Sequence, residues 1–318
     1  MRVVITGSGG RLGAALLRDY AKQFDVTGFN HAQLDLGDLD RVRATIDQQD
    51  FDLLINAAAF TNVDLAEKEK AQAFRINSDA PRLLAEICRE KGAQLIHVST
   101  DYVFKGDKTQ PYVEQDEPDP ISVYGQSKCA GEAAVLSESD RHLVVRVSWV
   151  FGPERPSFID QMIAMARESD QIAAVADKVS TPTYTRDIAE MLMKVVAGSQ
   201  MGVGVTPNAE SGNQLQAGVN GPSRTGLSGY SGILHIANSG ECTWQQYAQQ
   251  ALDCCRRIGM PLKASTVGAL KMSDMKNWIA RRPIRSVLST RKYADLTGQA
   301  PRSWQDAVAE YVRDFVAR

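Results

Sequence analysis

The amino-acid sequence predicts an α/β protein built on a doubly wound parallel sheet, with a smaller C-terminal module. Short, nearly continuous apolar runs alternate with amphipathic stretches over residues 1–150. This alternation is typical of parallel strands that are covered by helices on both faces and joined by right-handed crossovers. A glycine-rich turn directly follows the first apolar run. Together these features indicate a sheet of the Rossmann type.

The expected elements follow from the spacing of apolar residues. Strands are predicted at residues 3–5, 26–29, 53–55, 95–98 and 143–147, and again at 233–236. A first helix is predicted over 12–24, with Leu12, Leu16 and Tyr20 on its buried face. Near the C-terminus, Thr243 and Ser303 are each expected to cap a helix, because their hydroxyls can accept from first-turn N–H groups.

Two domains are expected from the change in pattern near residue 150. Residues 1–150 are predicted to form the dinucleotide-binding Rossmann domain. Residues 151–318 are predicted to mix the remainder of the sheet with a substrate-binding module. Residues 199–232 are rich in Gly, Ser, Asn and Pro and carry few large apolar residues. We expect a flexible surface insertion there, because such a segment buries too little surface to offset its ordering entropy.

The bulk composition restricts the classes of partner. The 318 residues carry a net charge of −2, so no basic field favours nucleic acid. No apolar run approaches the ~20 residues that a membrane helix requires. The first strand begins at once, which leaves no room for a signal peptide and suggests a cytoplasmic protein. The five cysteines lack C-x-x-C spacing, so neither a disulfide framework nor a metal site is assigned.

The glycine turn is the first candidate binding feature. Gly7, Gly10 and Gly13 follow a strand and open a helix, where a backbone can approach a pyrophosphate on the helix N-terminus. Their G-x-x-G-x-x-G spacing is one residue wider than the usual dinucleotide fingerprint. Arg11 and Leu12 lie within the same turn and are expected to contact the cofactor. The alternative is a strand-to-helix turn that binds no ligand.

The end of the second predicted strand bears on cofactor choice. An acidic residue there would favour NAD by bonding the adenosine ribose, but Asn30 is neutral. Arg11 could reach a 2′-phosphate, so the sequence favours NADPH and leaves NADH as the alternative. Asp35 and Leu36 are candidate adenine contacts, although Asp35 also suits a turn-capping role.

Two further strand ends are expected to reach the same edge of the sheet. Small residues Ala57, Ala58 and Ala59 follow the third strand and would let a cofactor lie against the backbone. Thr61 and Val98, in the segments that end the third and fourth strands, are also assigned to cofactor binding. Ligands bind at this carboxyl edge in doubly wound sheets.

Thr100, Tyr124 and Lys128 are the candidate catalytic residues. Thr100 ends the fourth strand, and the spacing of four places Tyr124 and Lys128 on one helical face. An isolated tyrosine titrates near pH ~10, and an adjacent ammonium would lower the pKa of the phenol. The same ammonium could bond the nicotinamide ribose, so Tyr124 and Lys128 also count as cofactor contacts. A surface helix without chemistry is the alternative.

Several motifs together resemble those of the extended short-chain dehydrogenases/reductases and, among these, the dTDP-4-dehydrorhamnose reductases. The matching segments are 56–64, 98–104, 124–128, 147–151, 180–183 and 280–283. The resemblance covers the chain outside 199–232. The run Ser-Thr-Asp-Tyr-Val-Phe at 99–104 and the Arg-Arg-Pro at 281–283 are its most specific parts.

The resemblance implies a keto-sugar reduction. Tyr124 would donate a proton to the sugar C4 oxygen as hydride arrives from the nicotinamide, and Thr100 would bond the carbonyl. Lys128 would orient the cofactor and tune Tyr124. Residues expected at the nucleotide-sugar substrate are Thr100, Asp101, Tyr102, Trp149 and Arg282. Arginine suits bidentate phosphate recognition, although a solvated basic loop remains the alternative for Arg282, and core packing for Trp149.

Other functions were weighed against this one. Related sugar-nucleotide dehydratases place an Asp-Glu pair after the threonine, whereas Asp101 is followed here by Tyr102, so dehydration is disfavoured. A non-catalytic subunit of the methionine adenosyltransferase type is the alternative from another class. A reductase of a different 4-keto-6-deoxy sugar nucleotide is the third reading. A homodimer is the one assembly considered.

Overall fold

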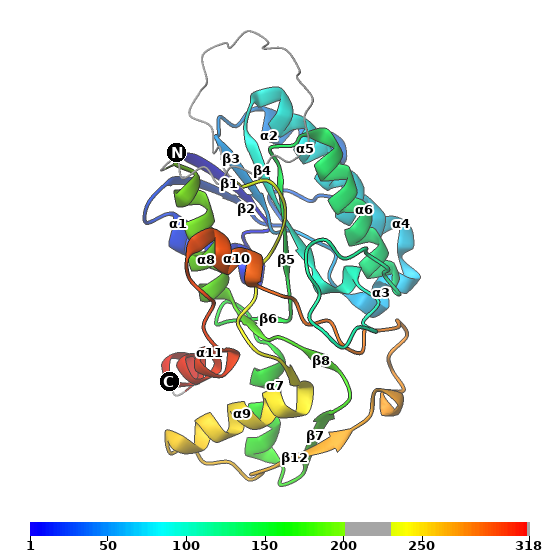
Figure 1. The fold of residues 1–318 in the computed structure, drawn as a ribbon, viewed down its shortest axis with the longest axis vertical. Helices are drawn as coiled ribbons and strands as arrows, with labels where there is room; N and C mark the ends of the chain where they lie inside the picture. Colours follow the sequence, from blue (N-terminus) through cyan, green and yellow to red (C-terminus); the bar gives the residue numbers. More distant parts are fainter. Residues whose placement is uncertain (201–229, 317–318) are drawn as a thin grey trace.

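The computed structural model describes residues 1–200 and 230–316, and a six-stranded parallel sheet forms its centre (Figure 1). The sheet has the order β10-β5-β4-β3-β1-β2. Its strands are β1 (Arg2–Thr6), β2 (Asp25–Phe29), β3 (Leu53–Asn56), β4 (Gln94–Thr100), β5 (Leu143–Val147) and β10 (Gly232–His235). All five pairings are parallel. The predicted fold class is therefore confirmed.

Helices cover both faces of the sheet, and this is why its strands are apolar throughout. One face carries α2 (Leu39–Asp47), α5 (Ala80–Lys91) and α6 (Val123–Glu138). The other carries α1 (Arg11–Tyr20), α8 (Thr185–Gln200) and α10 (Arg291–Thr297). Alternate strand residues serve the two cores: Val4 and Leu54 pack toward α2 and α5, whereas Ile5 packs toward α1 and α8. Between β3 and α5 lie α3 (Val63–Lys68), α4 (Lys70–Phe74) and a π-helix (Arg75–Asp79).

The strand order reverses between β1 and β3, and the turn after β1 packs closely at that point. Gly7 has φ +73°, and a Cβ built on it would lie 2.6 Å from the backbone nitrogen of Ala58. A Cβ on Gly13 would lie 2.1 Å from the carbonyl oxygen of Gly7. Only glycine permits these two approaches, which bring the start of α1 against β3 at the switch point where such sheets bind ligands.

Outside the layers of the sheet, the segments after β5 form a separate hydrophobic core, which we call the second core. It contains α7 (Phe158–Glu168), α9 (Trp244–Arg257) and α11 (Trp304–Tyr311). Three short strand pairs join them: β6 (Val150–Phe151) with β9 (Thr183–Tyr184), β7 (Ile172–Val175) with β12 (Val267–Leu270), and β8 (Val179–Ser180) with β11 (Cys242–Thr243). Single turns of 3₁₀-helix occur at Asp101–Val103 and Met272–Asp274, and a π-helix at Val312–Val316. The proposed domain boundary near residue 150 stays a prediction.

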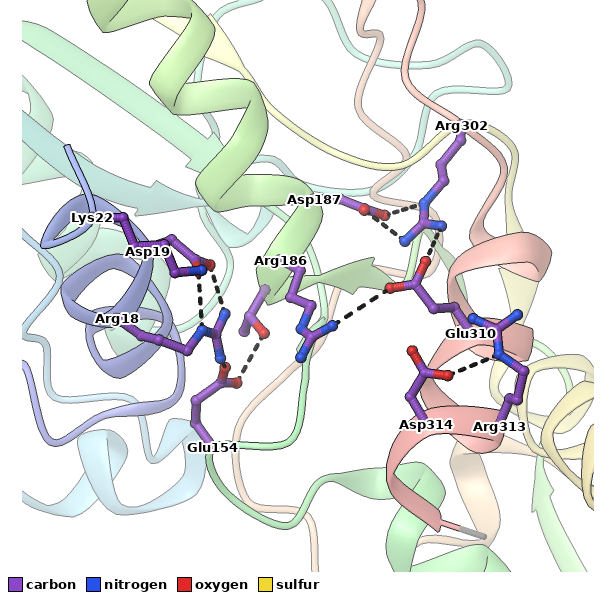
Figure 2. A network of polar contacts seen from close by, with 11 residues as sticks. Arg18, Asp19, Lys22, Glu154, Arg186, Asp187, Arg302, Glu310, Arg313 and Asp314 are labelled. Carbon is purple, nitrogen blue, oxygen red and sulfur yellow. Dashed lines mark hydrogen bonds and ion pairs between the residues drawn. The ribbon is translucent and has the colours of Figure 1, made fainter. Parts of the chain in front are cut away.

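Polar contacts fasten this second core to the sheet (Figure 2). Glu154 accepts from Arg18 of α1 at 2.5 Å and from Thr185 of α8 at 2.9 Å. Arg302 bonds Asp187 of α8 and Glu310 of α11, at 2.7 and 2.6 Å. These contacts hold the segment after β5 beside α1. No helix in the described part of the chain has the length and apolar character to cross a membrane.

The predicted elements are largely confirmed, with two corrections. Thr243 and Ser303 cap α9 and α11 as expected. The first helix ends at Tyr20 rather than residue 24, because the N–H groups of Lys22 and Gln23 donate to carbonyls only three residues back. Of the expected insertion at 199–232, α8 includes the first two residues and β10 begins at Gly232. Residues 201–229 lie outside the described residues.

Candidate active site

A cavity of about 1230 Å³ opens at the carboxyl edge of the sheet. The residues that line it include predicted cofactor and substrate contacts: Gly7, Gly10, Arg11, Leu12, Asn30, Asp35, Leu36, Ala57, Ala58, Ala59, Thr61, Val98, Thr100, Asp101, Tyr102, Tyr124, Lys128 and Trp149. Gly13 and Arg282 are the predicted site residues that do not line it. Gly13 instead supports the turn from beneath, through its close approach to Gly7.

The glycine turn presents backbone rather than side chains to the cavity. Gly10 is the N-cap of α1 and offers no side-chain oxygen, and the first turn holds no acidic residue. The first-turn N–H groups and the helix dipole therefore favour an anion at this end.

Arg11 requires a correction. Although it lines the cavity, its guanidinium donates to the carbonyls of Val150, Arg155 and Pro156, at 3.2, 3.3 and 2.7 Å. The guanidinium that was predicted to reach a 2′-phosphate is therefore bonded to the loop after β5. Arg155 is the second arginine at the cavity wall, and its Nε bonds the Gly9 carbonyl at 2.8 Å.

At the end of β2, Asn30 and Asp35 line the cavity while also shaping their own loop. Asn30 accepts from the Gln33 N–H at 3.1 Å, and Asp35 accepts from the Gly37 N–H at 2.8 Å. The turn-capping role considered for Asp35 is therefore present alongside its place in the wall. No carboxylate stands at the position of Asn30, so nothing there repels a ribose phosphate.

Thr100 and Asp101 form a buried hydroxyl–carboxylate group at the end of β4. The Thr100 hydroxyl donates to Asp101 at 3.1 Å and accepts from the Tyr102 N–H at 3.2 Å. Asp101 accepts further bonds from Ser148 and Ser286. Burial raises the pKa of this carboxyl, while Lys178 and the three hydroxyls act in the opposite direction. These hydrogen bonds place the Thr100 hydroxyl beside Tyr124.

Tyr124 occupies the first turn of α6, where its half-buried side chain lines the cavity. Burial raises its pKa to about 12, and the hydrogen bond from Thr100 opposes that rise. The ring of Tyr102 meets it edge-on with centroids 5.6 Å apart. Tyr124 is therefore a protonated phenol at neutral pH, which suits an acid that donates to an oxygen as negative charge develops there.

Lys128 lies one turn further along α6, but it points elsewhere than predicted. Its Nζ contacts the Val98 carbonyl at 2.7 Å and the His97 ring at 3.2 Å. Burial lowers its pKa to about 8, against the attraction of Glu132. The predicted lowering of the Tyr124 pKa by Lys128 is wrong for this arrangement, because the amine is held by β4 and burial of the phenol dominates.

Trp149 combines the two roles considered for it. Its indole lines the cavity and also packs on Trp244 and Tyr247, with centroid distances of 5.1 and 4.6 Å. Its φ of +41° is a strained value for a residue with a large side chain. The aromatic packing holds the ring against that strain, at the junction of β5 and the second core.

Arg282 makes contacts that the sequence did not predict. It forms a double contact with Asp64 of α3, at 2.6 and 3.1 Å, and stacks over Trp278 with the guanidinium carbon 4.0 Å from the ring centroid. Its side chain is only 8% exposed. Arg282 and two backbone N–H groups lower the Asp64 pKa to about 2. The arginine therefore fastens the 278–282 segment to α3, and its predicted contact with the diphosphate stays a prediction.

Two buried residues beside the site were missed by the sequence reasoning. Asn56 ends β3 and bonds His97 of β4, which in turn contacts Lys128. The signal was a histidine and an asparagine inside otherwise apolar strands. No group of three or more metal-ligating side chains lies together within 1–200 and 230–316.

Comparison with known proteins gives consistent matches along the chain. Residues 1–206 and 217–317 match the family described as RmlD substrate binding domain. The unmatched internal stretch, 207–216, is narrower than the 199–232 expected to fall outside a family pattern.

Individual relatives span nearly the whole chain. It is 35% identical to a dTDP-4-dehydrorhamnose reductase of Mycolicibacterium smegmatis, covering 99% of this chain and 86% of that protein. It is 34% identical to a probable dTDP-4,6-dihydroxy-2-methyloxan-3-one 4-ketoreductase of Streptomyces antibioticus, covering 100% and 96%. A solved Bacillus anthracis dTDP-4-dehydrorhamnose reductase in complex with NADP superposes with TM-score 0.82 at 28% identity, covering 98% of this chain and 99% of that one.

Proposed function

This chain belongs to the RmlD substrate-binding domain family, and from that membership we propose that it reduces dTDP-4-dehydrorhamnose to dTDP-L-rhamnose with hydride from NADPH. The curated relative from Mycolicibacterium smegmatis carries this reductase name. The cavity supports the proposal, because it joins a nucleotide-type glycine turn to an acid–hydroxyl pair suited to a carbonyl.

The single observation that carries the proposal is the meeting of Thr100, Tyr124 and Lys128 in one cavity with the glycine turn. These side chains come from the end of β4 and the start of α6. A strand–helix turn alone would explain the glycines, but not two hydroxyl groups and an amine at the other end of the same cavity.

When bound, NADPH supplies the hydride that adds to the sugar C4 carbon. Tyr124 then gives its phenolic proton to the C4 oxygen, so the C=O bond becomes an alcohol and a phenolate remains to be reprotonated from solvent. The Thr100 hydroxyl can stabilise the charge on one of these two oxygens at a time, because its single proton can turn from Asp101 toward that oxygen.

The residues present fit a dinucleotide. The uncapped first turn of α1 offers N–H groups to the pyrophosphate, and Ala57 to Ala59 offer a wall without bulky side chains. Asn30 leaves room for a 2′-phosphate. The Bacillus anthracis protein was solved with NADP, which supports NADPH over NADH for this chain.

The test is NADPH oxidation with dTDP-4-keto-6-deoxyglucose in the presence of the 3,5-epimerase that produces the substrate. Turnover by the wild-type protein, lost in Tyr124→Phe with cofactor binding retained, is the expected result. Tight NADPH binding without turnover would instead favour the non-catalytic subunit reading.

A second sugar is favoured by one observation. The Streptomyces antibioticus relative, nearly as similar, is named for a different 4-keto sugar. A hydroxyl or methylene difference in a pocket changes discrimination modestly, so the two dTDP-sugars should be compared by kcat/KM.

The partner is accordingly a nucleotide sugar. A cytoplasmic homodimer without nucleic-acid or membrane partners stays a prediction that sedimentation velocity and fractionation would test.

A further inference from the structure

A row of polar side chains crosses the sheet beneath Lys128. Thr6, Asn56 and His97 are register partners on β1, β3 and β4, so their side chains share one face. Asn56 and His97 are completely buried, and Thr6 is nearly so. A polar row inside an apolar sheet must satisfy its own hydrogen bonds, and this restricts where each proton can lie.

Asn56 is oriented by two donors. Its Oδ1 accepts from the Thr6 hydroxyl at 2.7 Å and from the backbone N–H of Ala58 at 3.2 Å. Because the N–H of Ala58 can only donate, the oxygen of the amide must face it. The Nδ2 group of Asn56 therefore faces the His97 ring, 3.1 Å from Nδ1.

This orientation fixes the tautomer of His97. An amide NH₂ has no acceptor, so His97 Nδ1 must accept and carries no proton. The ring is neutral, because its complete burial lowers the His97 pKa well below the usual range. A neutral ring with a bare Nδ1 carries its proton on Nε2, the atom 3.2 Å from Lys128 Nζ.

An Nε2–H group needs an acceptor, and an ammonium has none. A neutral amine has one lone pair for His97 and two N–H groups, of which one reaches the Val98 carbonyl at 2.7 Å. We therefore propose that His97, oriented by Asn56, is a positioning residue that holds Lys128 as a neutral amine until a ligand enters the cavity. This inference rests on the proposed function only in naming NADPH as that ligand.

The other charged groups near Lys128 do not remove the need for this arrangement. Tyr124 lies on the same helix and is a neutral phenol near pH 7. Glu132 is held by Arg146 through Nε and Nη2, at 2.9 and 2.6 Å, and accepts from Ser99. Its attraction for an ammonium is therefore shared. Burial lowers the Lys128 pKa to about 8, so the neutral amine is the main form above that pH.

Ligand binding would change this state by the transfer of one proton from solvent to Lys128. One proton from solvent forms a third N–H bond on Lys128 Nζ, and the contact with His97 Nε2–H breaks because both groups then donate. An anionic ligand rich in hydroxyl acceptors favours the ammonium. Above pH ~8, where the free amine is mainly neutral, Lys128 thus becomes a charged donor only when the site is loaded.

The first test reads the tautomer directly and needs no ligand. Protein labelled with ¹⁵N in its four histidines is examined by two-bond ¹H–¹⁵N correlation, and the His97 signals are assigned by their loss in His97→Gln. We expect an unprotonated Nδ1 and a protonated Nε2. Asn56→Asp should reverse this tautomer, since a carboxylate accepts from Nδ1–H. A protonated Nδ1 in the wild-type protein would overturn the proposal.

The second test measures proton uptake when NADPH binds at pH 9, by calorimetry in two buffers of different ionisation enthalpy. The wild-type protein should take up about one proton. In His97→Gln the new carbonyl accepts from an ammonium beforehand, so uptake should fall to near zero, as in Asn56→Asp.

His142→Gln is the matched control, because His142 lies just before β5 and is equally buried but bonds Leu95 and Ala85 instead. It should retain the uptake. Equal uptake by wild type and His97→Gln would contradict the proposal. Neither measurement depends on sugar reduction, so a wrong substrate assignment leaves both results interpretable.

Discussion

The two ends of the candidate site differ in how their residues are held. At the cofactor end, backbone and small side chains at strand ends form part of the wall, and of the predicted cofactor contacts only Gly13 lies outside it. At the substrate end, Arg282 is committed to Asp64 and the cavity wall lacks it. A local turn by itself places the backbone that faces the ligand. Whether a long charged side chain is free or paired depends instead on residues that are distant in the sequence.

The largest expected effect concerns the residue that lies between the two ends. Tyr124→Phe removes the proton donor and keeps the ring, so kcat should fall by about 10²- to 10⁴-fold. NADPH affinity, measured by fluorescence titration, should change little. Tyr20→Phe is a suitable control, since the buried Tyr20 hydroxyl has no hydrogen-bond partner in the described structure and lies outside the cavity. Equal losses in both variants would contradict the assignment.

Cofactor choice should respond to the end of β2. Asn30→Asp places a carboxylate beside the proposed 2′-phosphate, so KM for NADPH should rise at least about tenfold while KM for NADH changes little. Asn30→Gln, which adds bulk without charge, serves as the control. If Asn30→Asp keeps the preference for NADPH, the adenosine of the cofactor does not lie beside residue 30.

The substrate end should behave as a tether. Arg282→Ala and Asp64→Asn are each expected to raise KM for the sugar nucleotide, because both release the 278–282 segment, and the double variant should be no worse than either. In urea unfolding, the pair should show a coupling energy of about 0.5–3 kcal/mol. If Arg282 binds the diphosphate itself, Asp64→Asn will leave KM unchanged or lower it.

The smallest expected effect is the pH dependence of the same pair. The folded-state pKa of Asp64 is lowered to about 2, compared with about 3.9 in an unfolded chain. The stability that Asp64 contributes is therefore complete above pH ~4 and is lost as pH falls through the folded value. The difference in unfolding free energy between wild type and Asp64→Asn should shrink from pH 6 to pH 3. A constant difference would contradict the charge assignment.

The sequence was sufficient to predict the sheet and most of the cavity wall. Alternating apolar runs predict buried parallel strands, and the carboxyl ends of such strands meet at one edge. Thr100, Tyr124 and Ala57 to Ala59 were therefore found from local pattern and position alone.

The contacts that the sequence did not predict depend on the tertiary structure. The partners of Arg11 and Arg282 come from segments far away along the chain, the loop at 150–156 and Asp64 of α3. The state of Lys128 depends on His97 and Asn56, whose contact is set by strand register. Burial raises the Tyr124 pKa, and Lys128 is not among the groups that lower it, although the helical spacing suggests that it would be.

The most direct test of the central claim is isotope transfer. Reduction of dTDP-4-dehydrorhamnose with NADPH deuterated at nicotinamide C4 should give dTDP-L-rhamnose that carries one deuterium at sugar C4, detected by NMR and mass spectrometry. Deuterium at C4 in the wild-type product, with product lost in Tyr124→Phe, is the predicted result. NADPH binding without deuterium at C4 would contradict the account.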